Sequence, residues 1–179
     1  MIDVRDRAVL LVGFASGCRR SGLSQLNRED IVFKEEGLVI HLTSSKTDQE
    51  GKGRQIGIAY GSSPESCPVR ALKRWIERAE IQEGPLFRSI SRHGRLKEKR
   101  LQGQAINYMV KKHIKSIGKD PDRYGAHSLR SGLVTQSAIN GVGMLSIMEQ
   151  TGHQSEEIVR EYYKPATLFE NNASTELGL

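Results

Sequence analysis

The hydrophobic positions near the start of the chain predict two helices. Apolar residues between Val4 and Phe14 recur at helical spacing, which predicts a first helix over this stretch. Gly17 follows, and Ser21 is placed to cap a short second helix that runs through Leu26.

From residue 31 the pattern changes to the short apolar runs that are typical of β-strands. The runs IVF (31–33) and LVIHL (38–42) flank the polar turn KEEG and predict a β-hairpin. The polar loop TSSKTDQEGKGR then leads to a third predicted strand over residues 55–59. These segments predict a small three-stranded antiparallel sheet in the N-terminal third of the chain.

Helical spacing returns after Cys67. Pro68 stands at a first-turn position of the segment CPVRALKRWIERAEI, which places Leu72 and Trp75 on one face. The predicted helices cover residues 67–81, 102–117, 128–139, 144–150 and 155–163, with a basic loop over 89–100. Because no repeat or linker divides the chain, we expect one α+β domain, mainly α, over residues 1–179.

Composition narrows the class of protein. With 179 residues, 37% of them hydrophobic and 27% charged, the chain fits one soluble globular domain and excludes a disordered or fibrous protein. No apolar run approaches the roughly 18–20 residues that a membrane-spanning helix needs. The first residues lack the pattern of a secretory signal, and two cysteines make no disulfide framework. We therefore expect a cytoplasmic protein without membrane contact.

The basic residues are concentrated in one part of the chain. The net charge is +6, but residues 86–119 alone hold ten Lys and Arg against one acid, Glu98, a net charge of +9. Residues 149–179 hold six acids and two bases. This polarity is typical of proteins that bind a phosphate backbone. A solvated helix face beside a basic loop explains the charge alone equally well.

Several residues that carry chemistry lie in separate parts of the chain. His127 and Arg130 share a helix face at i and i+3, where an imidazole and a guanidinium reach one ligand. His153 follows a glycine at a predicted helix junction, and Tyr162 and Tyr163 lie on the next predicted helix. Two further candidates are Arg19, in GCRRSGL, and Lys46, in SSKTD. Each of these features is common by itself.

Their order along the chain is specific. The order is an arginine, a lysine in a predicted β-hairpin, HSLR, GH, and then a tyrosine nine positions after the histidine of GH. In this order the chain resembles the catalytic domain of the tyrosine recombinases, also named the phage integrase family. The resemblance extends from RDRAVLLVGFASGCRRSGL through SKTD, CPVRALKRWIERA and AHSLRSG to TGHQSEEIVREYY, almost the whole chain.

The resemblance implies a site that holds one scissile phosphate of DNA. Arg19 and Arg130 would bind its non-bridging oxygens and stabilise the charge of the pentavalent transition state. His153 would donate a third hydrogen bond to the same phosphate. The acidic residue that the family usually has three positions after its first arginine is Gly22 here, so we expect weakened activity.

The resemblance also implies the roles that break and rejoin the strand. Tyr162 would be the nucleophile that forms a 3′-phosphotyrosyl bond, and His127 would be its base. Lys46 would protonate the departing 5′ oxygen. The covalent intermediate retains the energy of the phosphodiester, so we expect no cofactor, metal or ATP. The family spacing selects Tyr162 over its neighbour Tyr163, and the GxR pattern selects Arg19 over Arg20.

Double-stranded DNA is the partner that the resemblance implies, together with other protomers of this chain in a DNA-bound tetramer. In the family, the segment after the tyrosine, here residues 165–179, docks on a neighbouring protomer. We expect backbone contacts from the basic loop and the helix after it, through Arg92, His93, Arg95, Lys97, Arg100 and Lys111. The chain starts at the first catalytic-domain helix, so we expect the family's N-terminal core-binding domain to be absent.

Two other functions stay open at this point. Gly22 and the expected absence of the second domain favour a catalytically weakened DNA-binding or regulatory remnant of an integrase. A metal-dependent hydrolase would use His127 and His153, although neither has a carboxylate or a second histidine at ligand spacing.

Overall fold

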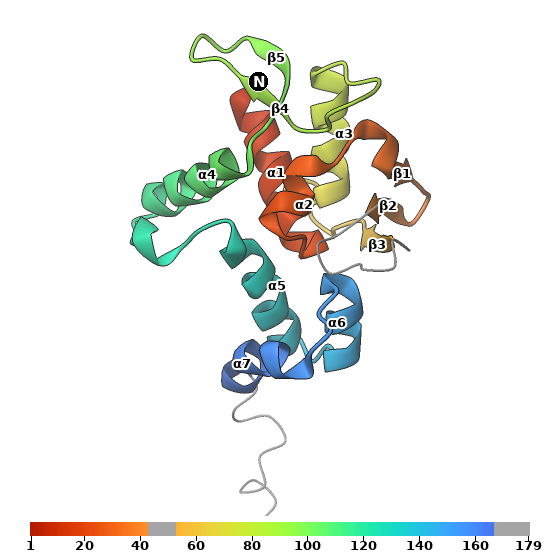
Figure 1. The fold of residues 1–179 in the computed structure, drawn as a ribbon, viewed down its shortest axis with the longest axis vertical. Coiled ribbons are helices and arrows are strands. Elements are labelled where there is room, and N and C mark those ends of the chain that lie inside the picture. The colour runs from red at the N-terminus through yellow and green to blue at the C-terminus, as the bar shows by residue number, and fades with distance from the viewer. Residues whose placement is uncertain (43–52, 167–179) are drawn as a thin grey trace, which may run out of the picture.

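The computed structural model describes residues 1–42 and 53–166. In the described part of the chain, the α-helices and β-strands are arranged around two cores (Figure 1). The elements are α1 (Ile2–Ser16), α2 (Arg20–Gln25), β1 (Ile31–Phe33), β2 (Gly37–Leu42), β3 (Arg54–Ala59), α3 (Pro68–Arg78), β4 (Arg88–Ile90), β5 (Leu96–Arg100), α4 (Gly103–Ser116), α5 (His127–Ile139), α6 (Met144–Thr151) and α7 (Glu156–Ala166). Short 3₁₀ helices cover Arg28–Asp30 and Pro121–Arg123. The mainly helical α+β class predicted from the sequence is confirmed.

Helix α1 is the centre of the first core. Its residues Val9 and Val12 are fully buried, and α3 packs beside it (Figure 1). Helix α3 begins at Pro68, where the fixed φ of proline suits the first turn. Its apolar face, including the fully buried Trp75, turns toward α1, and Trp75 Nε1 donates to the Leu86 carbonyl at 2.8 Å. The apolar face predicted for this segment is thus confirmed.

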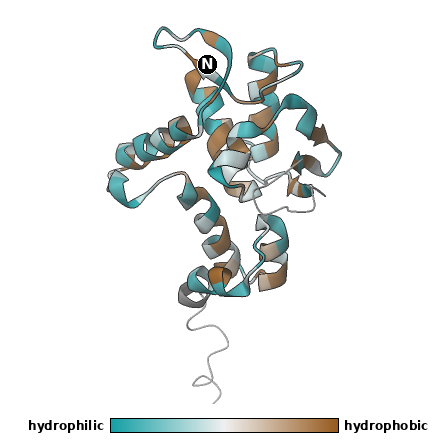
Figure 2. Ribbon diagram, in the orientation of Figure 1, coloured by the Kyte–Doolittle hydropathy of each residue, from teal (hydrophilic) through white to brown (hydrophobic). Residues whose placement is uncertain are grey.

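The three-stranded sheet is antiparallel in the order β1–β2–β3, as predicted. Ile31 of β1 pairs with Ile40 of β2, and Ile40 pairs with Ile56 of β3. All three isoleucines are buried, because residues directly opposite each other on paired strands lie on the same face of the sheet. On β3 the intervening residues Gln55 and Gly57 are exposed, so the sheet covers the first core with one side. Apolar and polar residues both occur along its strands (Figure 2).

The prediction of a basic loop over residues 89–100 is wrong, because a second antiparallel hairpin forms there from β4 and β5. Gly94 turns the chain at a φ of 77°. The strand β5, LKEKR, has one apolar residue and no alternation, so its sequence gives no strand pattern. Hydrogen bonds hold the hairpin instead, including Ser91 N to Arg95 O at 2.8 Å and Ser89 Oγ to Arg100 O at 3.0 Å.

Helices α5, α6 and α7 form a C-terminal lobe (residues 127–166) with its own small core (Figure 1). That second core consists of Val134, Ala138, Ile147 and Val159. The lobe joins the rest of the molecule along α1 and α5. Gly13 lies at this contact: a Cβ there would lie 2.9 Å from Leu129 Cδ1, so the end of that side chain would have to shift. None of the helices in the described residues is long and apolar enough to cross a membrane.

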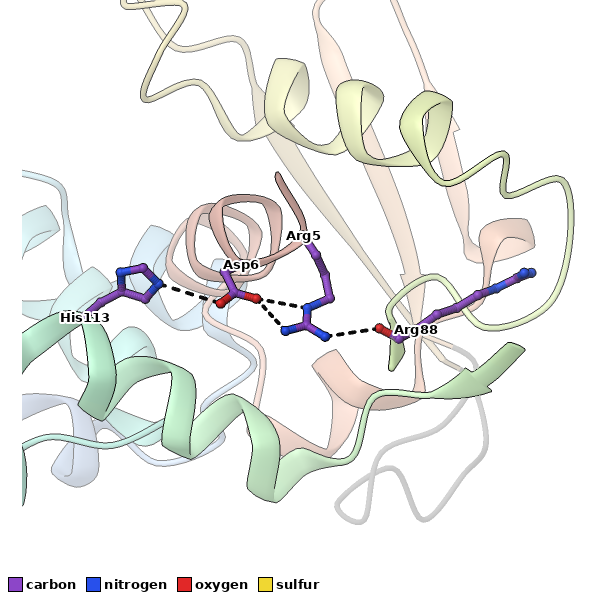
Figure 3. A network of polar contacts seen from close by, with 4 residues as sticks. All are labelled: Arg5, Asp6, Arg88 and His113. Carbon is purple, nitrogen blue, oxygen red and sulfur yellow. Dashed lines mark hydrogen bonds and ion pairs between the residues drawn. The ribbon is translucent and has the colours of Figure 1, made fainter. Parts of the chain in front are cut away.

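A polar network attaches α4 and β4 to α1 (Figure 3). Asp6 is buried and accepts two hydrogen bonds from Arg5, at 2.7 and 2.9 Å. Arg5 Nη1 also donates to the Arg88 carbonyl at 3.5 Å, and His113 Nε2 of α4 lies 3.8 Å from Asp6 Oδ2. The pairing compensates the cost of burying the carboxylate and fixes α4 beside the first core.

Candidate active site

Arg19 lies at the junction between α1 and α2. Helix α1 ends at Gly17, whose φ of 59° is left-handed and whose N–H donates to the Phe14 carbonyl. Arg19 is the N-cap residue of α2. Ser21 lies inside this helix, so the prediction that it caps α2 is wrong. The neighbouring Arg20 points toward α4, where its Nη1 donates to Gln104 Oε1 at 3.4 Å.

Arg130 is a buried cation one helical turn after His127 on α5. Its Nη1 donates to Gly17 O at 2.6 Å and to Thr151 O at 2.5 Å, so it joins the α1–α2 junction to the end of α6. Burial, and then the charges of Arg19 and Arg54, lower the pKa of Arg130 to about 10, so it stays protonated at neutral pH.

The Nη2 nitrogen of Arg130 makes no hydrogen bond to the described residues. Among the buried side-chain nitrogens and oxygens of residues 1–42 and 53–166, Arg130 Nη2 and His113 Nε2 lack a hydrogen-bond partner. A buried guanidinium with an unused donor, close to other cations, is suited to bind an anion. The site therefore offers a receptor for an oxyanion such as phosphate.

His127 and Tyr162 face each other across the C-terminal lobe. Tyr162 Oη of α7 lies 3.5 Å from His127 Nε2, at the first residue of α5. The start of α5 is fixed from α4, because Asn107 Oδ1 accepts from the Ala126 N–H at 3.0 Å. The partly buried rings of Tyr162 and Tyr163 pack against the second core. The structure therefore brings a phenol and an imidazole within reach of one proton transfer.

His153 lies just beyond the end of α6. Its Nδ1 is 2.7 Å from Thr151 Oγ1, and Thr151 Oγ1 is also 2.7 Å from the Ile147 carbonyl. Burial lowers the pKa of His153 to about 4, helped by the charges of Arg130, Arg19, His127 and Arg54. At neutral pH the imidazole is therefore uncharged.

Arg54 is a further cation near this site that the sequence pattern did not indicate. It is the first residue of β3, one position before the predicted start of that strand. Burial lowers the pKa of Arg54, Cys18 raises it and Arg19 lowers it, so the three side chains are close enough to interact. The one feature of the sequence that could have indicated Arg54 is its position at the end of the polar segment that contains Lys46. Lys46 itself lies outside the described residues.

The predicted DNA-binding residues occupy two kinds of position. Arg92, His93, Arg95 and Lys97 are exposed on the β4–β5 hairpin. Arg100 is half-buried instead, and it donates to Ser24 O at 3.1 Å, Leu26 O at 2.9 Å and Asn27 Oδ1 at 2.6 Å. Lys111 lies on α4 and forms an ion pair of 2.8 Å with Asp122.

Gly22, which replaces the acid of the family pattern, has open space around it. A Cβ built at Gly22 meets no described heavy atom within 4 Å. An alanine Cβ therefore meets no obstacle among the described residues at this position. In the described ranges, no three His, Cys, Asp or Glu side chains are grouped as a metal site requires.

Comparison with protein families and with individual proteins gives a consistent result. The model of the phage integrase family matches residues 1–168. The chain is 40% identical to an integrase/recombinase xerD homolog of Selenomonas ruminantium, over 95% of this chain and 50% of that protein. It is 30% identical to the tyrosine recombinase XerC of Thermodesulfovibrio yellowstonii, over 84% of this chain and 47% of that protein. The chain thus spans about half the length of these relatives.

Solved structures share the fold. The XerH site-specific recombinase bound to palindromic difH substrate, in a post-cleavage complex, superposes with a TM-score of 0.74 at 20% identity, over 99% of this chain and 46% of that one. The XerA recombinase superposes with a TM-score of 0.69 at 22% identity, over 99% of this chain and 56% of that one. The match of the family model to most of the chain, over a fold that gathers Arg19, His127, Arg130, His153 and Tyr162, shows that this chain belongs to the phage integrase family, the tyrosine recombinases.

Proposed function

We propose that this chain cleaves and rejoins DNA strands through a 3′-phosphotyrosyl intermediate, as the catalytic part of a site-specific recombinase. The observation that carries the proposal is the unused, buried Nη2 donor of Arg130 in a cluster of cations, with the His127–Tyr162 pair beside it. A phosphodiester is the anion that suits both the receptor and a phenol nucleophile.

Arg19, Arg130 and His153 bind the scissile phosphate in this proposal. The two guanidinium groups neutralise the non-bridging oxygens, where charge grows in the transition state. A neutral imidazole carries one proton, and the hydroxyl of Thr151 carries one as well. Because the Thr151 hydroxyl donates its proton to the Ile147 carbonyl, its oxygen accepts from His153 Nδ1. His153 then donates to a phosphate oxygen when Nε2 takes up a second proton, which the negative charge of the bound phosphate favours.

Cleavage starts at Tyr162. Its Oη attacks the phosphorus, its proton passes to His127 Nε2, and the bond between phosphorus and the 5′ oxygen breaks. Lys46 gives a proton to that oxygen, which leaves as a 5′-hydroxyl. Rejoining reverses each step with a second 5′-hydroxyl, so neither a cofactor nor ATP enters.

Double-stranded DNA is the substrate, and other protomers of this chain assemble with it in a tetramer on that DNA. Exposed Arg92, Arg95 and Lys97 on the β4–β5 hairpin supply backbone contacts in this proposal. Two related XerH complexes were solved bound to difH substrate, which supports DNA as the ligand class. In this proposal the protein acts in the cytoplasm, on the DNA there.

The chain acts as an enzyme in this proposal, not as a weakened remnant. The comparisons give no support for reduced activity. A Cβ at Gly22 would meet no described heavy atom within 4 Å. The six residues assigned to the reaction are all present in the sequence.

A pool of nicked duplexes with randomised centres tests the proposal, because the nick traps a cleaved strand as a covalent adduct. We expect an SDS-resistant protein–DNA adduct in EDTA that disappears in Tyr162→Phe and persists in the matched control Tyr163→Phe. DNA binding without any adduct would favour the remnant. Cleavage that EDTA abolishes, with no adduct, would favour the metal-dependent hydrolase.

A further inference from the structure

Arg54 connects the three-stranded sheet to the end of α6. Its Nη1 donates to the carbonyls of Glu149 and Gln150, at 3.1 and 3.0 Å. The last carbonyls of a helix lack partners within the helix, and a cation at this end interacts favourably with the helix dipole. Arg54 therefore caps α6 from an element 95 residues earlier in the chain.

The same contact explains the glycine before His153. Gly152 ends α6 with a φ of 70°, and a Cβ there would lie 2.6 Å from Arg54 Nη1 and 2.7 Å from Arg54 Cζ. The position requires glycine for the left-handed turn and also for the close approach of the guanidinium. The Gly-His pair in the sequence thus reflects the packing of Arg54.

The segment that Arg54 holds bears two groups of the phosphate site. The next carbonyl, that of Thr151, accepts from Arg130 Nη1, and Thr151 Oγ1 contacts His153 Nδ1. Gln150 adds a second tie, because its Nε2 donates to Ala15 O at 2.9 Å and to Gly57 O at 3.0 Å. Residues 149–153 are therefore fixed to α1 and β3 on one side and to the catalytic groups on the other.

We propose that Arg54 is a positioning residue, which clamps the end of α6 to β3 and so sets the places of His153 and the Arg130 guanidinium. The effect on DNA chemistry rests on the proposed function. The clamp itself is a property of the protein without DNA. It also holds β3, whose first residue is Arg54, against the turn that contains His153.

Arg54→Met removes the clamp and keeps most of the volume of the side chain, and Arg54→Lys retains the charge on a single donor nitrogen. The matched control is Arg70→Met, since Arg70 also donates to a backbone carbonyl, that of Gly61, on α3 away from the site. The first measurement is the NMR titration of His153 in the protein without DNA, assigned with His153→Gln. The second compares the rate of adduct formation with the affinity for duplex DNA.

In the wild type and in Arg70→Met, we expect the His153 pKa near 4; in Arg54→Met we expect it to rise toward 6.5, because the ring gains water and loses a neighbouring cation. Adduct formation should slow by about 100-fold in Arg54→Met at nearly unchanged DNA affinity. Arg54→Lys should lie between the two.

An unchanged His153 titration in folded Arg54→Met overturns the inference, whatever the activity. If Arg54→Met does not fold, the same titration of Arg54→Lys decides, and a wild-type value there overturns the clamp. A chain that never forms an adduct refutes the proposed function alone, because the titration needs no DNA.

Discussion

Tyr162 Oη and His127 Nε2 lie 3.5 Å apart, although 35 residues separate them in the sequence. The contact joins α7 to the first residue of α5, so it depends on the packing of the C-terminal lobe. It is longer than an ideal hydrogen bond, which is common for catalytic pairs before the substrate binds. The pair defines the chemistry that we propose for this chain.

Replacing His127 tests its role as base. In His127→Ala we expect adduct formation to slow by about 10²–10⁴-fold, because the phenol loses its proton acceptor. DNA affinity should change little, and raising the pH should recover part of the rate because hydroxide takes the place of the missing base. Gel analysis of adduct against time at several pH values measures this. Equal rates in wild type and variant would exclude His127 as the base.

The stability of the protein should depend on pH through His153. The pKa of His153 is about 4 in the folded protein, below its ordinary value of 6.5. As the pH falls, the unfolded chain takes up this proton first, so stability is complete above pH 6.5 and decreases toward pH 4. Thermal unfolding across this window should show a steeper loss in the wild type than in His153→Gln. Parallel curves would contradict the assignment.

Gly22 supplies a test of the missing acid. Gly22→Ala should stabilise the protein by about 0.5–1 kcal/mol, because glycine weakens a helix interior and the site is open. Gly22→Glu should then form adduct within about threefold of Gly22→Ala, a difference below 1 kcal/mol. A gain of about tenfold or more would show that the missing carboxylate limits the reaction.

The basic hairpin should contribute to DNA affinity through charge. Arg95→Gln and Lys97→Gln should each reduce the slope of log affinity against log salt by about 0.9 for duplex DNA. Arg100→Gln is the contrasting variant: it should lower the unfolding free energy by about 1–3 kcal/mol through its lost hydrogen bonds and leave the slope unchanged. Unchanged slopes in the first two variants would remove the hairpin from the DNA-binding surface.

The sequence predicted the elements whose side chains carry a regular signal. The helical spacing that placed Leu72 and Trp75 inside arises because burial selects apolar residues at a fixed period, and the short apolar run around Ile40 marked a strand of the sheet. The spacing of the motif residues likewise placed His127 and Arg130 one helical turn apart, and the fold adds Tyr162 from α7.

Contacts to the backbone escaped prediction, because any residue supplies a carbonyl. Arg54 binds the carbonyls of Glu149 and Gln150, and Arg100 binds those of Ser24 and Leu26. Neither contact depends on the residue type of the partner, so the sequence does not indicate it. The β4–β5 hairpin was missed for a related reason: its strands are held by backbone and serine hydrogen bonds while its side chains stay polar.

The most direct test of the account is the identity of the residue that becomes attached to DNA. Adducts trapped on the nicked duplexes are digested with protease and nuclease, and mass spectrometry locates the residue that carries the 3′-phosphate. The account predicts Tyr162. Attachment at Tyr163 or at any other residue, in a protein whose Tyr162→Phe variant still forms the adduct, would contradict it.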